Sequence, residues 1–121
     1  MKLCYIAGCY SNNTYLHVEQ NILDAKKAGV EAIARGYYPV IPHANTPHFE
    51  HVCIDKHPSF WYNGTMELLK RCDAIMIFGD WTTSQGTHNE LEYAINHKMP
   101  TMFAHGKSME VFEDLYGGVK I

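Results

Sequence analysis

The stretch from Ala74 to Phe78 restricts the fold most, because five consecutive apolar residues leave no polar face toward water. A strand with one solvated face alternates apolar and polar side chains, whereas a strand covered by helices on both faces of a parallel sheet is apolar throughout. The stretch is also far shorter than the ~20 residues that cross a bilayer. We therefore expect a central strand of a mainly parallel α/β sheet in a soluble protein.

The N-terminal third has the pattern of a strand, a helix and a second strand. Residues 3–7 are apolar, and the polar residues 12–14 offer side chains that can cap a helix. Small and aliphatic residues then recur at steps of three and four, namely Val18, Ile22, Ala25, Gly29, Ala32 and Ile33. Gly36 follows where a helix commonly ends, and residues 37–41 favour a strand. This unit predicts two parallel strands.

The rest of the chain continues the alternation after a long loop, residues 42–58, that contains three prolines and four histidines. We expect a helix over residues 59–71 capped by Ser59, the apolar strand, a loop over 79–86, a helix over 87–97, a strand over 101–103 and a final helix over 108–115. Without a linker or repeat, residues 1–121 are predicted to form a single α/β domain. Ligands in such sheets bind beyond the carboxyl ends of the strands, where loops 8–13, 42–58 and 79–86 should lie.

The composition narrows the class of partner. Ten Lys and Arg against 13 Asp and Glu give a net charge of -3, which argues against a protein that binds nucleic acid through a basic face. The four cysteines include no Cys-x-x-Cys pair, and we see neither a signal peptide nor a membrane span. We expect reduced thiols, a cytoplasmic location and a small-molecule ligand.

Two loops contain residues that suit an anionic or electrophilic ligand. The segment from Gly8 to Asn13 leads into a helix N-terminus that attracts phosphate, although its Asn and Ser residues also suit a turn that caps the helix. Glu90 has two interpretations as well. Thr87-x-x-Glu90 has the spacing of a capping box, whereas a Glu in the first helical turn stays ionised and can attack a sugar carbon.

The long loop carries four side chains of zinc-binding types within eleven residues, namely His43, His48, His51 and Cys53. Their spacings match none of the familiar zinc patterns, so we interpret the segment as a ligand-contacting or packing loop and expect no metal. Phe60, Trp61 and Tyr62 follow one another on a helix, where successive residues point ~100° apart. We expect these rings to pack in the core or at a subunit interface rather than to stack on a base, and at least one of them to contact a second subunit. For Cys9, only a place near a helix N-terminus favours a nucleophilic role.

Five segments, in order, resemble a known family. They are Cys4-Tyr5-Ile6-Ala7-Gly8, Gly36-Tyr37-Tyr38-Pro39-Val40-Ile41-Pro42-His43, Phe60-Trp61 with Gly64-Thr65, Arg71-Cys72-Asp73-Ala74, and Ser84-x-Gly86-Thr87-x-x-Glu90-Leu91. Together they resemble the nucleoside 2-deoxyribosyltransferase-like superfamily, and more closely its small DUF4406 branch of bacteria and phages. The resemblance covers residues 2 to about 104 and implies a flavodoxin-like three-layer sandwich in a homo-oligomer whose neighbouring subunit helps to close each site.

The resemblance also implies roles for particular residues. Glu90 would attack the anomeric carbon of a nucleoside, Tyr5 would support that carboxylate, and Ser84 would contact sugar or phosphate. The expected ligand-binding residues are Gly8, Cys9, Tyr10, Ser11, His43, Asn45, Trp61, Ser84, Gly86 and Thr87. No cofactor is expected.

Two departures from the superfamily pattern bear on catalysis. Cys9 replaces a proline, which changes the stiffness of the first loop. Thr65 stands eight residues before Asp73, where the enzymes carry an Asp. A hydroxyl cannot replace a carboxylic acid as the proton donor to a leaving base, although Asp80 or Glu67 could substitute. Two functions therefore stay open: cleavage or transfer at an N-glycosidic bond, and a non-catalytic phage protein that sequesters an ADP-ribose-derived immune signal.

Overall fold

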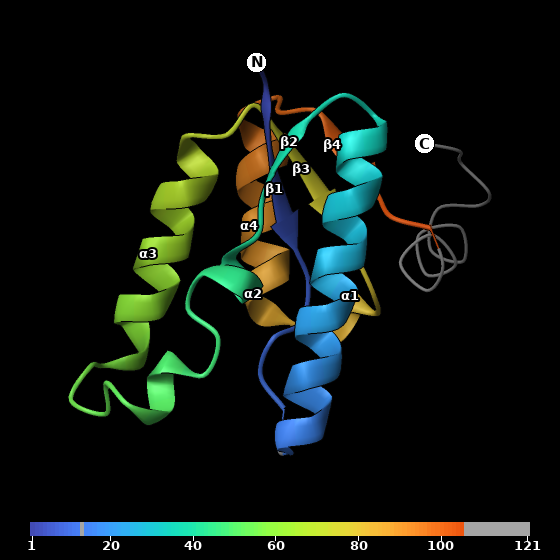
Figure 1. Ribbon diagram of the computed structural model, residues 1–121. Helices are drawn as coiled ribbons and strands as arrows, with labels where there is room; N and C mark the ends of the chain where they lie inside the picture. Colours follow the sequence, from blue (N-terminus) through green and yellow to red (C-terminus); the bar gives the residue numbers. More distant parts are fainter. Residues whose placement is uncertain (13, 106–121) are drawn as a thin grey trace.

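A computed structural model describes residues 1–12 and 14–105 as a four-stranded parallel sheet between helices (Figure 1). In chain order the elements are β1 Leu3–Ala7, α1 Tyr15–Ala34, β2 Tyr38–Val40, α2 Pro42–Asn45, the 3-10 helix η1 Phe49–His51, α3 Pro58–Lys70, β3 Ala74–Ile77, the 3-10 helix η2 Trp81–Thr83, α4 Gln85–Asn96 and β4 Thr101–Phe103. The expected final helix over residues 108–115 lies outside the described residues.

The strand order is β2-β1-β3-β4, with β1 and β3 in the middle. In the register, Tyr5 of β1 lies opposite Val40 of β2 and Ile75 of β3. This is the order of the first four strands of flavodoxin-like sheets, and the direction of the order reverses between β1 and β3. The predicted parallel α/β fold is therefore confirmed, and its reversal point lies beside the loops that leave β1 and β3.

Helices cover both faces of the sheet. On one face, the small Ala25, Ala28 and Ala32 of α1 pack against Cys4 and Ile6. On the other face, α3 and α4 bury Leu69 and Ala94 against Ile75 and Ile77 together with Trp81. Figure 1 shows α1 on one side of the strands and α3 with α4 on the other. This makes a three-layer sandwich.

The apolar stretch that begins at Ala74 is the central strand that its composition predicts. All four residues of β3 are fully buried. Phe78 lies just beyond the strand, and its N–H donates to the carbonyl of Ala7 at 2.9 Å. A strand with apolar residues on both faces thus has a helical layer on each.

Two helix starts differ from the sequence prediction. α3 begins at Pro58, and the imidazole of His57, rather than Ser59, is the cap: its Nδ1 accepts the N–H of Ser59 at 3.1 Å. α4 begins two residues earlier than expected because the Ser84 hydroxyl accepts the N–H of Thr87 at 3.2 Å. In the part of the chain that is described, no helix is both long and apolar enough to span a membrane.

Candidate functional site

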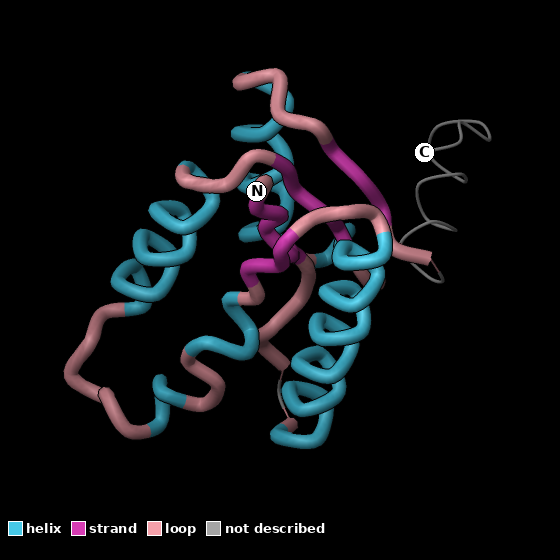
Figure 2. The backbone as a smooth tube through the Cα atoms, turned by 45° about the horizontal axis from the view of Figure 1, so that its top comes forward, coloured by secondary structure: helices cyan, strands magenta, loops and turns pink. Residues whose placement is uncertain are grey.

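A cleft of about 990 Å³ opens at the carboxyl ends of β1 and β3. Its walls come from the first loop, from the segment between β2 and α3, from α3, and from the start of α4. Figure 2 shows the β2–α3 segment, mostly loop, running from the middle of the molecule to the start of α3. The volume matches the upper range for small-molecule sites and is large enough for a nucleotide.

A buried carboxyl and phenol meet in this cleft. Glu90, 8% exposed, projects from the second turn of α4, and Tyr5, 1% exposed, projects from β1. The Tyr5 hydroxyl donates to Oε2 of Glu90. Because α4 is capped by Ser84, Glu90 lies too far along the helix to form the capping box that its spacing suggests, and the capping interpretation is wrong.

The environment sets the protonation of this pair. Burial raises the pKa of Glu90 to about 7. The hydrogen bond from Tyr5 acts in the opposite direction but is the smaller effect. Burial, and then the neighbouring charge of Glu90, raise the pKa of Tyr5. Near neutral pH the phenol therefore keeps its proton, while Glu90 exchanges between acid and carboxylate. A carboxyl poised in this way at a cleft can act as a nucleophile or a proton-transfer group.

Thr65 occupies the position where the resemblance expects a carboxylic acid. Its hydroxyl donates to the carbonyl of Tyr62 at 3.0 Å and lines the cleft. Neither substitute considered above lies in the cleft wall. Asp80 accepts a hydrogen bond from Thr82, and Glu67 pairs with Lys70 and Arg71 on the surface of α3.

Buried contacts hold the first loop in place. Burial lowers the pKa of His43, so its imidazole is neutral, and its Nε2 lies 2.8 Å from the carbonyl of Cys9. The Cys9 thiol donates to the carbonyl of Asp80 at 3.3 Å, which ties the loop after β1 to the loop after β3. A Cβ at Gly8 would lie 2.5 Å from the ring of Phe78, so only glycine fits there without a shift of that ring.

All twelve residues proposed from the sequence line the cleft. They are Tyr5, Gly8, Cys9, Tyr10, Ser11, His43, Asn45, Trp61, Ser84, Gly86, Thr87 and Glu90. Phe60 and Tyr62, expected in the core or at an interface, also line it. The sequence analysis did not identify two charged residues of the cleft wall, Glu50 and Lys56. The only indication that they line a site was that they lie in an unusually long loop.

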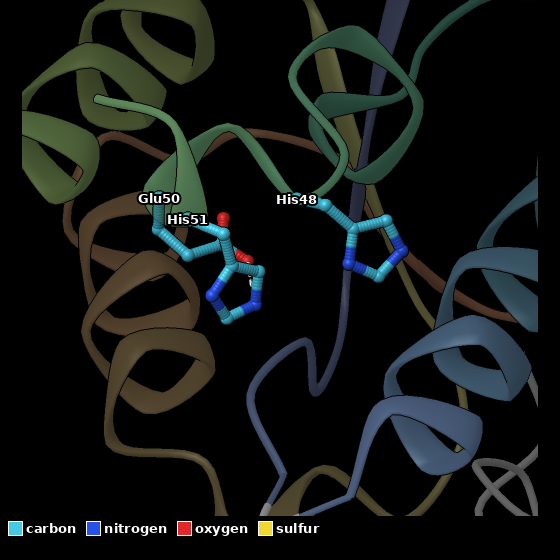
Figure 3. Close-up of side chains that lie close together, drawn as sticks. All are labelled: His48, Glu50 and His51. Atoms are coloured by element: carbon cyan, nitrogen blue, oxygen red, sulfur yellow. Dashed lines mark ion pairs between the residues drawn. The ribbon is translucent and has the colours of Figure 1, made fainter. Parts of the chain in front are cut away.

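One group of side chains has the composition of a metal site. His48, Glu50 and His51 each offer a ligand atom, and these atoms lie within 4.8 Å of one another (Figure 3). Of the four zinc-type side chains noted in the sequence, two belong to this group. His43 instead contacts the first loop.

Comparison with known proteins gives a family without an assigned activity. The family model of a domain of unknown function, DUF7768, matches residues 2–104. No curated protein matches the chain.

Proposed function

The chain belongs to the DUF7768 family, and we propose that its cleft binds a nucleoside- or nucleotide-type ligand and cleaves or transfers at the N-glycosidic bond through Glu90. The observation that carries this proposal is the buried Glu90 carboxyl, held by the Tyr5 hydroxyl at the carboxyl ends of two central parallel strands. The resemblance to the nucleoside 2-deoxyribosyltransferase-like superfamily assigns the same two residues these roles.

The walls of the cleft suit the parts of such a ligand. The rings of Phe60, Trp61 and Tyr62 offer faces for a base. The start of α4 supplies N–H groups for an anion, and Lys56 supplies a positive charge. Lys56 also lies 5.2 Å from the Phe60 ring centroid, so the cation and the ring share one side of the cleft.

In the proposed reaction, the Glu90 carboxylate attacks the anomeric carbon as the bond from that carbon to the base breaks. The electron pair of the broken bond goes to the base, which takes a proton from water. A water molecule or an acceptor base then displaces Glu90. Tyr5 keeps its proton and orients the carboxylate through the hydrogen bond between them.

Thr65 favours a second candidate, sequestration of a nucleotide such as an ADP-ribose-derived signal without chemistry. A threonine hydroxyl is too weak an acid to protonate a leaving base. The wall also contains long polar side chains, Glu50 and Lys56, that suit a ligand larger than a nucleoside.

We place either function in the cytoplasm and in a homo-oligomer. The described cysteines are free, and Cys4 and Cys72 are buried thiols, as is usual in a reducing compartment. Phe60 is 51% exposed and Tyr62 39% exposed on α3 beside the cleft, where a second subunit would cover both rings and deepen the site.

One experiment separates the two candidates. The protein is incubated with nucleosides, deoxynucleoside monophosphates and ADP-ribose conjugates, and chromatography follows free base and any intact ligand released on denaturation. The matched variants are Glu90→Gln and, as a control, Glu92→Gln, which changes an exposed carboxyl on the same helix. Catalysis requires base release by wild type and Glu92→Gln but not by Glu90→Gln. Intact ligand recovered from all three proteins supports sequestration, and neither product nor bound ligand contradicts both.

A further inference from the structure

We propose that His48, Glu50 and His51 form a binding site for a divalent transition-metal ion of the zinc class at the edge of the cleft. Figure 3 shows the three side chains leaving one turn of the loop on the same side of it. One ligand atom from each lies within 4.8 Å of the other two. Glu50 also lines the cleft, so the ion would lie at its wall.

The backbone of this turn brings the two imidazoles together. Phe49–His51 is a 3-10 helix, in which residues three apart lie over one another. The rings of His48 and His51 are accordingly stacked, with centroids 6.1 Å apart and planes 20° apart. His48, at the start of the turn, has φ 63°, a left-handed conformation that few residues other than glycine adopt.

A second carboxylate prepares His48 to act as a ligand. Glu19 of α1 contacts the Nε2 atom of His48, so that nitrogen carries the proton and donates to the carboxylate. The opposite nitrogen, Nδ1, then has a free lone pair. Nδ1 is buried and has no hydrogen-bond partner among the described residues. Metal-binding histidines almost always have this arrangement, in which the second ring nitrogen donates to a carboxylate or carbonyl.

Tyr10 holds the third ligand in place. Its hydroxyl donates to Oε1 of Glu50 at 2.9 Å and accepts the backbone N–H of His48 at 2.8 Å. A carboxylate has enough lone pairs to accept this bond and still bind a cation. One phenol from the first loop therefore fixes both the ligand Glu50 and the backbone of the ligand His48.

The donor set selects the ion. Two imidazoles and one carboxylate suit zinc and its neighbours in the transition series, whereas Ca²⁺ and Mg²⁺ prefer oxygen ligands. Bonds of about 2.0–2.2 Å in a tetrahedron separate ligand atoms by roughly 3.3–3.5 Å, so the three side chains must draw closer on binding. The His51 side chain, 69% exposed, is free to turn inward. Three protein ligands leave one position for water or an anion.

The test is titration of the full-length protein with Zn²⁺ by calorimetry in buffer free of chelators, and with Co²⁺ by visible absorption, which reports four-coordinate geometry. We expect one equivalent to bind. His51→Gln should weaken affinity at least tenfold, and Glu19→Gln, which leaves all three ligands in place, should weaken it 10- to 100-fold. The matched control is His97→Gln, which removes an exposed imidazole at the end of α4 and should leave affinity unchanged.

Equal affinity of wild type and His51→Gln, or an equal loss in His97→Gln, would overturn the proposal, because either result means adventitious binding to surface histidines. The His51 side chain is 69% exposed, so this variant stays informative even if substitutions at His48 unfold the loop. The readout is metal binding alone. The metal site and the proposed glycosidase activity are therefore tested independently: a protein without that activity can still bind the metal, and an active protein can fail to bind it.

Discussion

Replacement of Glu90 by Gln should make the protein more stable, and increasingly so as the pH rises. The folded pKa of Glu90 is about 7, against 4.5 for the unconstrained side chain. Between these values the folded state holds more protons than the unfolded state, so the free energy of unfolding falls as pH rises through this window. A pKa difference of one pH unit corresponds to 1.36 kcal/mol, so the raised pKa of Glu90 lowers the free energy of unfolding by about 3 kcal/mol above pH 7. Gln is similar in shape but does not titrate, so it avoids this cost.

The measurement is urea unfolding of wild type and Glu90→Gln at half-unit steps from pH 4 to 8.5. The difference between the two proteins removes the contribution of the other ionisable groups, which both proteins share. We expect this difference to grow in favour of the variant by about 3 kcal/mol, mostly between pH 4.5 and 7. Parallel stability curves would refute the buried, raised-pKa carboxyl. Glu92→Gln, on the exposed side of the same helix, should give such parallel curves.

Three further predictions concern the cleft. Tyr5→Phe removes the hydrogen bond that lowers the pKa of Glu90, so a carbon-13 titration of that carboxyl should shift up by roughly one to two pH units; an unmoved midpoint would exclude the contact. Gly86→Val should weaken nucleotide binding, measured by calorimetry. It should not lower the melting temperature, because a Cβ there meets only the Ser84 hydroxyl, at 4.0 Å. Unchanged affinity would mean that the phosphate binds elsewhere. In light scattering we expect at least a dimer mass, and Trp61→Ala should reduce it together with ligand binding; a wild-type monomer with ligand present would rule out the shared site.

The layers of the fold were predictable because burial on both faces leaves a clear mark on the sequence. The residues of β3 are apolar throughout, and α1 shows small residues at helical spacing on the face that packs against the sheet. The residues at which the helices begin were harder to predict from the sequence. The Thr87-x-x-Glu90 spacing suits a capping box, but Ser84 caps α4 three residues earlier, and both hydroxyl side chains are of the type that caps helices. His57 as the cap of α3 was missed because histidine is not among the usual cap residues, whereas Ser59 is.

The site was predictable where it follows the ends of strands and less so in the long loop. Tyr5 lies within β1 and Ser84 caps α4, and the parallel topology dictates the positions of both elements. The position of Glu50 and the pairing of His48 with Glu19 depend on how residues 42–58 fold back over α1. The sequence of this loop has no helical or strand periodicity from which its course can be predicted. The metal-type group therefore appears only when distant segments are placed together, since its histidine spacing alone matches no familiar pattern.

The edge strand β2 limits how copies of this protein can associate. It has only three residues, and its central residue, Pro39, lacks the N–H that an added strand would need as a donor. Short edge strands that contain proline are poor templates for a neighbouring chain, and they protect parallel sheets from aggregating edge to edge. Assembly by extending the sheet at β2 is therefore disfavoured, whereas side-chain contacts between helices do not depend on this edge. The same feature should keep the protein from forming fibrous aggregates through this edge at high concentration.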